Sequence, residues 1–235
     1  MMQKFQTPTQ TQTPPQTQTQ TPITVLLNIP AGQIHLVATD RADTTVQILP
    51  SDASKRRDAK AAEQTAIDFA DGVLRIATDD PNKVLGSSGS LDVTIALPSG
   101  SRVEGKAGAA ELFSTGRLGT VSFDGAYRTV ALDEIAGGTV TMHMGDLSIA
   151  KLTGSAHLRN GKGDITVAEA VAGSVELRTD AGNLTIAAAH GVSGTLDAGT
   201  AHGRVTNAMR NSEGAGAGLA VKATTSHGDI TATSL

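Results

Sequence analysis

The sequence predicts an all-β protein in which short antiparallel N-terminal strands lead into a β-solenoid, a parallel β-helix-like stack of about six coils. Two observations predict this fold class. Short runs of alternating apolar and polar residues, separated by turns that contain Gly or Pro, are typical of strands. In the second half of the 235-residue chain, a segment of about 18 residues recurs six times, which is too short for a helical repeat and fits one coil of a β-solenoid.

Composition excludes several function classes. The chain has 0 Cys, which excludes disulfide scaffolds, Cys-ligated zinc, iron–sulfur clusters and thiol catalysis. Its net charge of -4, without a basic face, argues against nucleic-acid binding. No apolar run is long enough for a transmembrane helix, so we expect no membrane insertion.

Residues 1–22 are expected to form a disordered tail. Between residues 3 and 22 the chain has seven Gln, seven Thr and four Pro, and such a segment cannot bury apolar surface. The tail lacks the apolar stretch and small-residue cleavage site of a secretory signal, so the expected location is the cytoplasm.

Residues 23–100 are expected to form an N-terminal β region. Alternating apolar residues predict strands at 23–27, 34–37, 46–49 and 91–97, with a turn at 30–32 between the first two. Two further strands at 67–69 and 73–76 read as a hairpin around Asp71-Gly72. The polar segment 51–63 is predicted to be a charged loop or one short helix, and its basic run at 55–57 is flanked by Asp52 and Asp58.

Residues 101–235 carry the repeat. The six segments align on anchors spaced by 17, 18, 19, 21 and 25 residues: Thr129, Asp146, Asp164, Asn183, Arg204 and Asp229. Positions eight and six before each anchor, and one and three after it, are almost all apolar or small. Stacked coils bury such columns, because like residues fall on like residues.

The late increase in spacing predicts an insertion at 207–218 that bulges from the stack, and a weaker seventh coil is expected at 103–114. An antiparallel meander of hairpins is the alternative topology. Its strands would also alternate between apolar and polar residues, but a meander does not require the same position to be apolar in every repeat.

Residues 23–235 resemble the bacterial DUF4097 family, often labelled "putative adhesin". The resemblance is carried by the segments 29–32, 71–76 and 97–101 and by the Gly-Asp-Ile-Thr turns at 163–166 and 228–231. Residues 2–5 also resemble the start of actinobacterial members. The resemblance implies a β-solenoid without an established enzyme activity, and it defines no catalytic residues.

One outward-facing patch is the candidate binding face. Positions seven and five before the anchors place five polar side chains on a single sheet: His157, Arg159, Glu176, Arg178 and Asp197. Stacked arginines repel each other unless a carboxylate or a bound anion compensates them. The patch is therefore either a solvated face with charges paired between coils, or a contact for carbohydrate or anions, and the second case includes a carbohydrate-active enzyme.

A calcium- or metal-stabilised binding module is a further alternative. Gly145-Asp146, Gly163-Asp164 and Gly228-Asp229 resemble calcium-binding turns, but calcium β-rolls need a denser Gly-Asp pattern. A turn carboxylate that accepts hydrogen bonds from backbone amides explains these residues equally well. His202 and His227 share a column, yet zinc needs at least three protein ligands, so we predict no metal site and no cofactor.

The sequence therefore predicts a non-catalytic β-solenoid scaffold or binding protein, adhesin-like and without nominated catalytic residues. Its protein or glycan ligand is not specified by any motif. The chain stops six residues after the last anchor, and an uncovered coil is a template for another strand. We expect the C-terminal solenoid edge to pair with a second copy, giving a dimer or a short filament.

Overall fold

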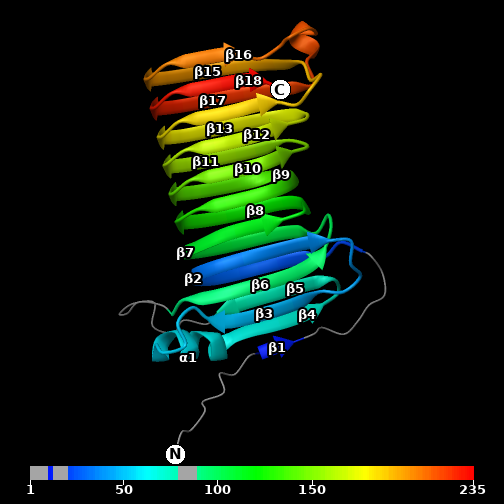
Figure 1. The fold of residues 1–235 in the computed structure, drawn as a ribbon, viewed down its shortest axis with the longest axis vertical. Helices are drawn as coiled ribbons and strands as arrows, with labels where there is room; N and C mark the ends of the chain where they lie inside the picture. The colour runs from blue at the N-terminus through cyan, green and yellow to red at the C-terminus, as the bar shows by residue number, and fades with distance from the viewer. Residues whose placement is uncertain (1–9, 13–20, 79–88) are drawn as a thin grey trace, which may run out of the picture.

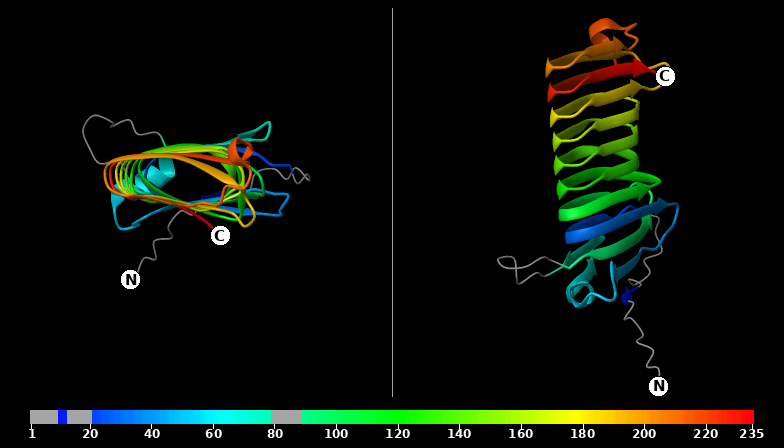
Figure 2. Two further views of the ribbon diagram at one scale, coloured as in Figure 1. Left: turned by 90° about the horizontal axis from the view of Figure 1, so that it is seen from above. Right: turned by 60° about the vertical axis from the view of Figure 1, so that its left-hand side comes forward.

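The computed structural model describes residues 10–12, 21–78 and 89–235, and these form an all-β molecule. The strands of the described residues join in one 18-stranded sheet. Figure 1 shows them stacked along the long axis of the molecule, and the view from above in Figure 2 shows that the chain winds around a flattened oval. Most of the predicted 1–22 tail lies outside the described residues.

The N-terminal part contains six strands and one helix of the described chain. Their bounds are β1 Gln10–Gln12, β2 Thr24–Thr39, β3 Thr45–Pro50, α1 Arg56–Gln64, β4 Thr65–Ala70, β5 Val73–Thr78 and β6 Leu91–Pro98. β1 lies within the segment predicted to be a disordered tail, and it pairs antiparallel with β3.

The rest of the chain is a succession of strands separated by short turns. Their bounds are β7 Arg102–Thr115, β8 Arg117–Tyr127, β9 Val130–Met144, β10 Leu147–Leu152, β11 Ala156–Lys162, β12 Ile165–Ala170, β13 Gly173–Ala181, β14 Leu184–Ala188, β15 Gly194–His202, β16 Val205–Ala208, η1 Gly214–Gly216, β17 Leu219–His227 and β18 Ile230–Ser234.

Parallel pairing confirms the predicted alignment of the repeat. On one side of the oval, Leu158 of β11 pairs with Val140 of β9 and with Leu177 of β13. On the other side, Leu147 of β10 pairs with Ile165 of β12. These side chains are at most 1 % exposed, because each coil covers the apolar column of the next. The antiparallel meander is therefore wrong for this region.

The N-terminal region differs from the predicted set of short antiparallel strands. β2 is one strand of 16 residues that pairs in parallel with β5, β6 and β7. The predicted turn at 30–32 is a bend within it. Gly32 has a φ of +130°, and a Cβ there would clash with the backbone of Leu91. Glycine therefore lets the chain bend here while β2 stays paired with the strands beside it. Antiparallel pairing is found for β1 with β3, β3 with β6, and β4 with β5.

Two local predictions in this region have different outcomes. The hairpin at Asp71-Gly72 is confirmed: β4 and β5 pair antiparallel, and both turn residues have positive φ, as a two-residue type I′ turn requires. α1 begins at Arg56 and ends at Gln64, so the helix alternative holds for most of the segment 51–63, and its first five residues form a loop. Ala61 of α1 is buried in the core, and the carboxylate of Asp58 accepts a hydrogen bond from the backbone N–H of Ser90 at 3.0 Å.

The last two coils are stacked out of chain order. β17 pairs with β13 on one side and with β15 on the other, and β18 pairs in the same way with β14 and β16. The C-terminal coil is thus inserted between its two predecessors, and β15 and β16 form the outermost coil (Figure 1). The predicted free edge on the C-terminal coil is wrong, because both of its strands are paired on both sides.

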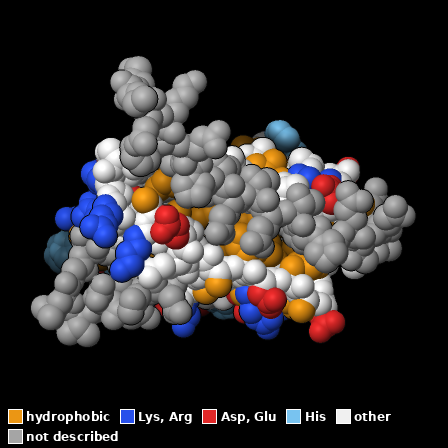
Figure 3. Space-filling view, turned by 90° about the horizontal axis from the view of Figure 1, so that it is seen from below, with side chains coloured by type: hydrophobic (Ala, Val, Ile, Leu, Met, Phe, Trp, Pro, Cys, Tyr) orange, Lys and Arg blue, Asp and Glu red, His pale blue; other side chains and the backbone are white. Residues whose placement is uncertain are grey.

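The two ends of the stack differ. At the N-terminal end, α1 packs beside β3, β5 and β6, and the basic side chains seen in Figure 3 gather on the side where α1 lies. At the other end, the inward-facing residues of β15 and β16 lose the cover that other coils have. Val205 is 42 % exposed, whereas its partner Ile230 in the next coil is fully buried.

Candidate binding face

The candidate face lies on the outside of the sheet that contains β11, β13, β15 and β17. Two columns of outward side chains run along the stack at right angles to the strands. In stacking order, the first column contains Arg75, Leu26, Glu104, Ser122, Thr139, His157, Glu176, Lys222 and Asp197. The second column contains Ala77, Asn28, Lys106, Asp124, Thr141, Arg159, Arg178, Thr224 and Gly199.

Four of the five predicted residues lie together. His157 pairs with Glu176, and Nδ1 of His157 lies 3.2 Å from a carboxylate oxygen of Glu176. Arg159 pairs with Arg178 on the same two strands, so their side chains leave the sheet one strand spacing apart.

Asp197 is separated from the other four residues. Lys222 of the inserted C-terminal coil pairs with Glu176 on one side and with Asp197 on the other. The repeat already placed Lys222 in this column, but chain order put it beyond Asp197. The structure therefore adds Lys222 to the face and gives both carboxylates a cationic neighbour.

The two arginines are the uncompensated part of the face. Both side chains are exposed, and within the described residues neither has an ion pair or a hydrogen bond. Their neighbours in the column are Thr141 and Thr224, which carry no charge. Glu176, two residues before Arg178, is held by His157.

The opposite side of the molecule has alternating charges. There Arg117 pairs with Glu134, Glu134 with Lys151, and Lys151 with Glu169. Each charge in this column has a neighbour of opposite sign, which is the favourable cross-strand arrangement. The like-charged Arg159–Arg178 pair departs from this pattern.

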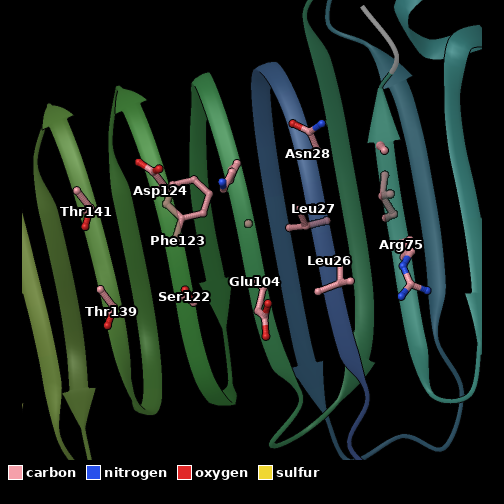
Figure 4. A pocket seen from close by; sticks show the side chains of 14 residues that line it. Leu26, Leu27, Asn28, Arg75, Glu104, Ser122, Phe123, Asp124, Thr139 and Thr141 are labelled. Carbon is pink, nitrogen blue, oxygen red and sulfur yellow. The ribbon is translucent and has the colours of Figure 1, made fainter.

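A shallow groove of about 460 Å³ lies further along the same face, over β2, β5, β7, β8 and β9. Figure 4 shows its labelled side chains on neighbouring strands, including Leu26, Arg75 and Glu104. Glycine at 105 makes room for a ring beneath the groove, because a Cβ there would lie 2.9 Å from the ring of Phe123. Sequence reasoning missed this groove, since it depends on β2 and β5 joining the parallel stack.

Two of the three basic residues at 55–57 have carboxylate partners nearby. Nζ of Lys55 lies 3.1 Å from Asp52, and Nε of Arg57 lies 3.4 Å from Asp58. Hydrogen bonds from Ser54 and Lys55 lower the pKa of Asp52 to about 2. This segment therefore fits a solvated charged surface better than an anion site.

The turn aspartates form a ladder between coils. In each step a backbone N–H donates to the side-chain oxygen of the turn residue in the neighbouring coil. Asp164 donates to Asp146, and Asn183 donates to Asp164. Asp229 donates to Asn183, and Arg204 donates to Asp229. Each side chain in this ladder satisfies the amide of the next coil. Asn183 serves in the same way as the carboxylates, so the role requires an acceptor oxygen and not a charge.

The two histidines suggested for a metal site stack on each other. The ring centroids of His202 and His227 lie 4.7 Å apart with an interplanar angle of 4°. Among the described residues, no group of three or more His, Cys, Asp or Glu side chains is placed to hold a metal ion. No helix in the described part of the chain is long and apolar enough to cross a membrane.

Comparison with known proteins gives structural likeness at low sequence identity. No protein-family model matches the chain, and no curated protein matches it. A "putative adhesin" from Parabacteroides distasonis ATCC 8503 is 11% identical, with 95% of this chain and 96% of that chain covered and a TM-score of 0.49. A "putative adhesin" from Bacteroides fragilis NCTC 9343 is 12% identical, with 97% and 98% covered and a TM-score of 0.45.

A third similar structure carries a different name. It is a "putative lipid binding protein" from Parabacteroides distasonis ATCC 8503, 10% identical over 95% of this chain and 96% of that chain, with a TM-score of 0.37. The expected likeness to adhesin-named bacterial proteins is thus found at the level of structure. Membership of the DUF4097 family and the actinobacterial type stay predictions.

Proposed function

We propose that the chain is a non-catalytic β-solenoid, with about six coils from the sequence repeat, that binds an acidic polysaccharide along its outer polar face. The observation that carries this proposal is the Arg159–Arg178 pair, two exposed guanidinium groups on adjacent strands that have no carboxylate partner among the described residues. Guanidinium groups bind carboxylates through two parallel hydrogen bonds, and adjacent ones are stabilised when an anion lies between them.

A polymer suits this face better than a small anion. Arg159 and Arg178 lie in one column on successive strands, and Lys222 follows on the next strand in the neighbouring column, between Glu176 and Asp197. The cations are therefore spread along the stack rather than gathered around a point. The parallel strands beneath them hold this spacing, which reduces the ordering cost of binding. Such a surface fits an extended chain that carries acidic groups at intervals.

Titration calorimetry with a polygalacturonate oligomer, and with dextran as the uncharged control, tests the proposal. We expect wild-type protein to bind the oligomer in a salt-sensitive manner, and the double variant Arg159→Gln, Arg178→Gln to lose at least about tenfold in affinity. The matched control is Arg117→Gln, Lys151→Gln, which removes the same charge from the opposite side. Equal loss in both double variants, or binding of dextran, would show that the arginine pair is not the site.

The carbohydrate-active enzyme is the competing function for the same face. It predicts new reducing ends or unsaturated uronate when the oligomer is incubated with the protein, and loss of that turnover in Arg159→Ala, Arg178→Ala. Our proposal predicts an unchanged oligomer. The proposed cytoplasmic location is tested separately, because protease added to intact cells degrades only a surface-exposed protein.

A further inference from the structure

The outermost coil, formed by β15 and β16, leaves two strand edges unpaired at one end of the molecule. β15 pairs only with β17, and β16 only with β18, among the described strands. Their outer N–H and C=O groups therefore face away from the stack. Inward-facing Leu196 and Ala198 are only partly buried, and Val205 is 42 % exposed.

This end lacks the features that usually protect an edge strand. Natural edges are blocked by Lys, Pro or bulges, or are covered by a helix or loop. Between Gly194 and Ala208 there is no Pro and no Lys, and only Asp197 and Arg204 carry a permanent charge. The following loop covers just one corner, where the backbone N–H of Gly194 donates to the carbonyl of Arg210 and Met209 packs on the core.

We infer that this end is the interface of a two-fold dimer with a second copy of the chain. The turn at Gly203 reverses the chain, so β15 and β16 run in opposite directions on the two sheets, about 10 Å apart. A single strand from another protein would pair with one edge only. A second copy, turned by 180° about an axis that crosses the end perpendicular to the two sheets, presents two edges at the same spacing. β15 then lies antiparallel to β15 of the second copy, and β16 antiparallel to β16.

Two features favour a closed dimer over the filament that the sequence also allowed. Head-to-tail growth needs a complementary surface at the other end, and that end is occupied by α1 and antiparallel strands. A further parallel coil would also need an acceptor for its turn amide. The ladder of turn residues ends at Arg204, and a guanidinium group contains only donors, so it cannot accept a hydrogen bond from a further coil.

The size of the end suits a weak dimer. β15 has nine residues and β16 has four, so their edges are about 30 Å and about 13 Å long, and each is about 10 Å wide with its outward side chains. This gives about 900 Å² for both partners together, in the range of weak and transient interfaces. We therefore expect an equilibrium between monomer and dimer that shifts with concentration.

Sedimentation velocity of the full chain over a wide concentration range tests this inference. We expect a species of twice the chain mass that dissociates on dilution. Val205→Lys places a charge in the contact at a residue that is exposed in the monomer, so it should raise the dissociation constant by about tenfold or more while the protein still folds. The control is Thr231→Lys, which faces outward on β18, a strand that is paired on both sides, and it should keep the dimer.

Cross-linking tests the symmetry, because the chain has 0 Cys. With a short thiol cross-linker, the single variant Thr206→Cys should give a covalent dimer, since a two-fold axis brings the two open ends together. Lys60→Cys, on α1 at the closed end, should give none. A monomer at every concentration, an assembly larger than two copies, or cross-linking through Lys60→Cys would overturn the inference.

Discussion

The ladder of turn residues predicts how Asp164 contributes to stability. Its carboxylate accepts a hydrogen bond from the backbone N–H of Asn183 at 2.7 Å, and both residues are exposed. Asp164→Ala leaves this amide to water, so the loss is that of a capping hydrogen bond, about 1–2 kcal/mol, and not the full cost of a buried orphan. For a chain of this size, that corresponds to a fall in Tm of about 2–8 °C.

The variant Asp164→Asn distinguishes a hydrogen-bonding role of this side chain from a calcium-binding role. An Asn side chain retains an acceptor oxygen, as Asn183 shows at the same position of the next coil, whose oxygen accepts from the N–H of Asp229 at 2.9 Å. We therefore expect Asp164→Asn to melt close to wild type, and neither calcium nor a chelator to move Tm. A calcium-stabilised protein would instead lose stability in Asp164→Asn and gain it with added calcium. That result, in calorimetry or circular dichroism, would refute the structural role.

Two further substitutions test the packing. Leu177→Ala, in a fully buried column, should cost about 2–5 kcal/mol, whereas Leu196→Ala, in the outermost coil, should cost about 1 kcal/mol or less in dilute monomer. Equal costs in urea unfolding would contradict the observed coil order. Asn160→Thr should keep or raise Tm, because Thr179 makes the equivalent bond to a glycine carbonyl and the buried, unpaired Oδ1 of Asn160 is removed. A clear loss of Tm would show that Asn160 has a specific role.

The apolar columns could be predicted because parallel stacking is periodic. A residue in one coil lies beside its equivalent in the next, so the packing requirement at Leu158 is repeated at Leu177 and is written in the sequence as a column. The hairpin at Asp71-Gly72 could be predicted for a different reason: its turn is specified by two adjacent residues with positive φ.

The bend at 30–32 shows where local signals mislead. Pro30 and Gly32 are typical turn residues, and they do change the direction of the chain. Whether the chain then forms a hairpin or continues around a coil depends on its neighbours, and here β7 follows β2 in parallel from Thr24 to Val37. Such pairing between residues 78 positions apart leaves no mark on the local sequence.

The order of the last coils could not be predicted from the columns, because both orders use the same register. Val175 pairs with Val221, and Val221 with Leu196, so the apolar column would be continuous whichever coil lies outside. The informative signal is the anchor spacing, which rises from 17–19 residues to 21 and then 25. The longer link from β14 to β15 lets the chain skip one level of the stack. The link from β16 to β17, which contains η1, then returns the chain to the level that was skipped.

This coil order determines the surfaces that the protein presents. Insertion of β17 places Lys222 between Glu176 and Asp197, so the carboxylates of the outer face are compensated and the charge excess stays at Arg159 and Arg178. The same insertion moves β15 and β16 to the end of the stack, where their edges are unpaired. Had the coils followed chain order, Asp197 would lie beside Glu176 as two adjacent like charges, and the C-terminal coil would be exposed. The polar face and the open end are thus two consequences of one topological feature.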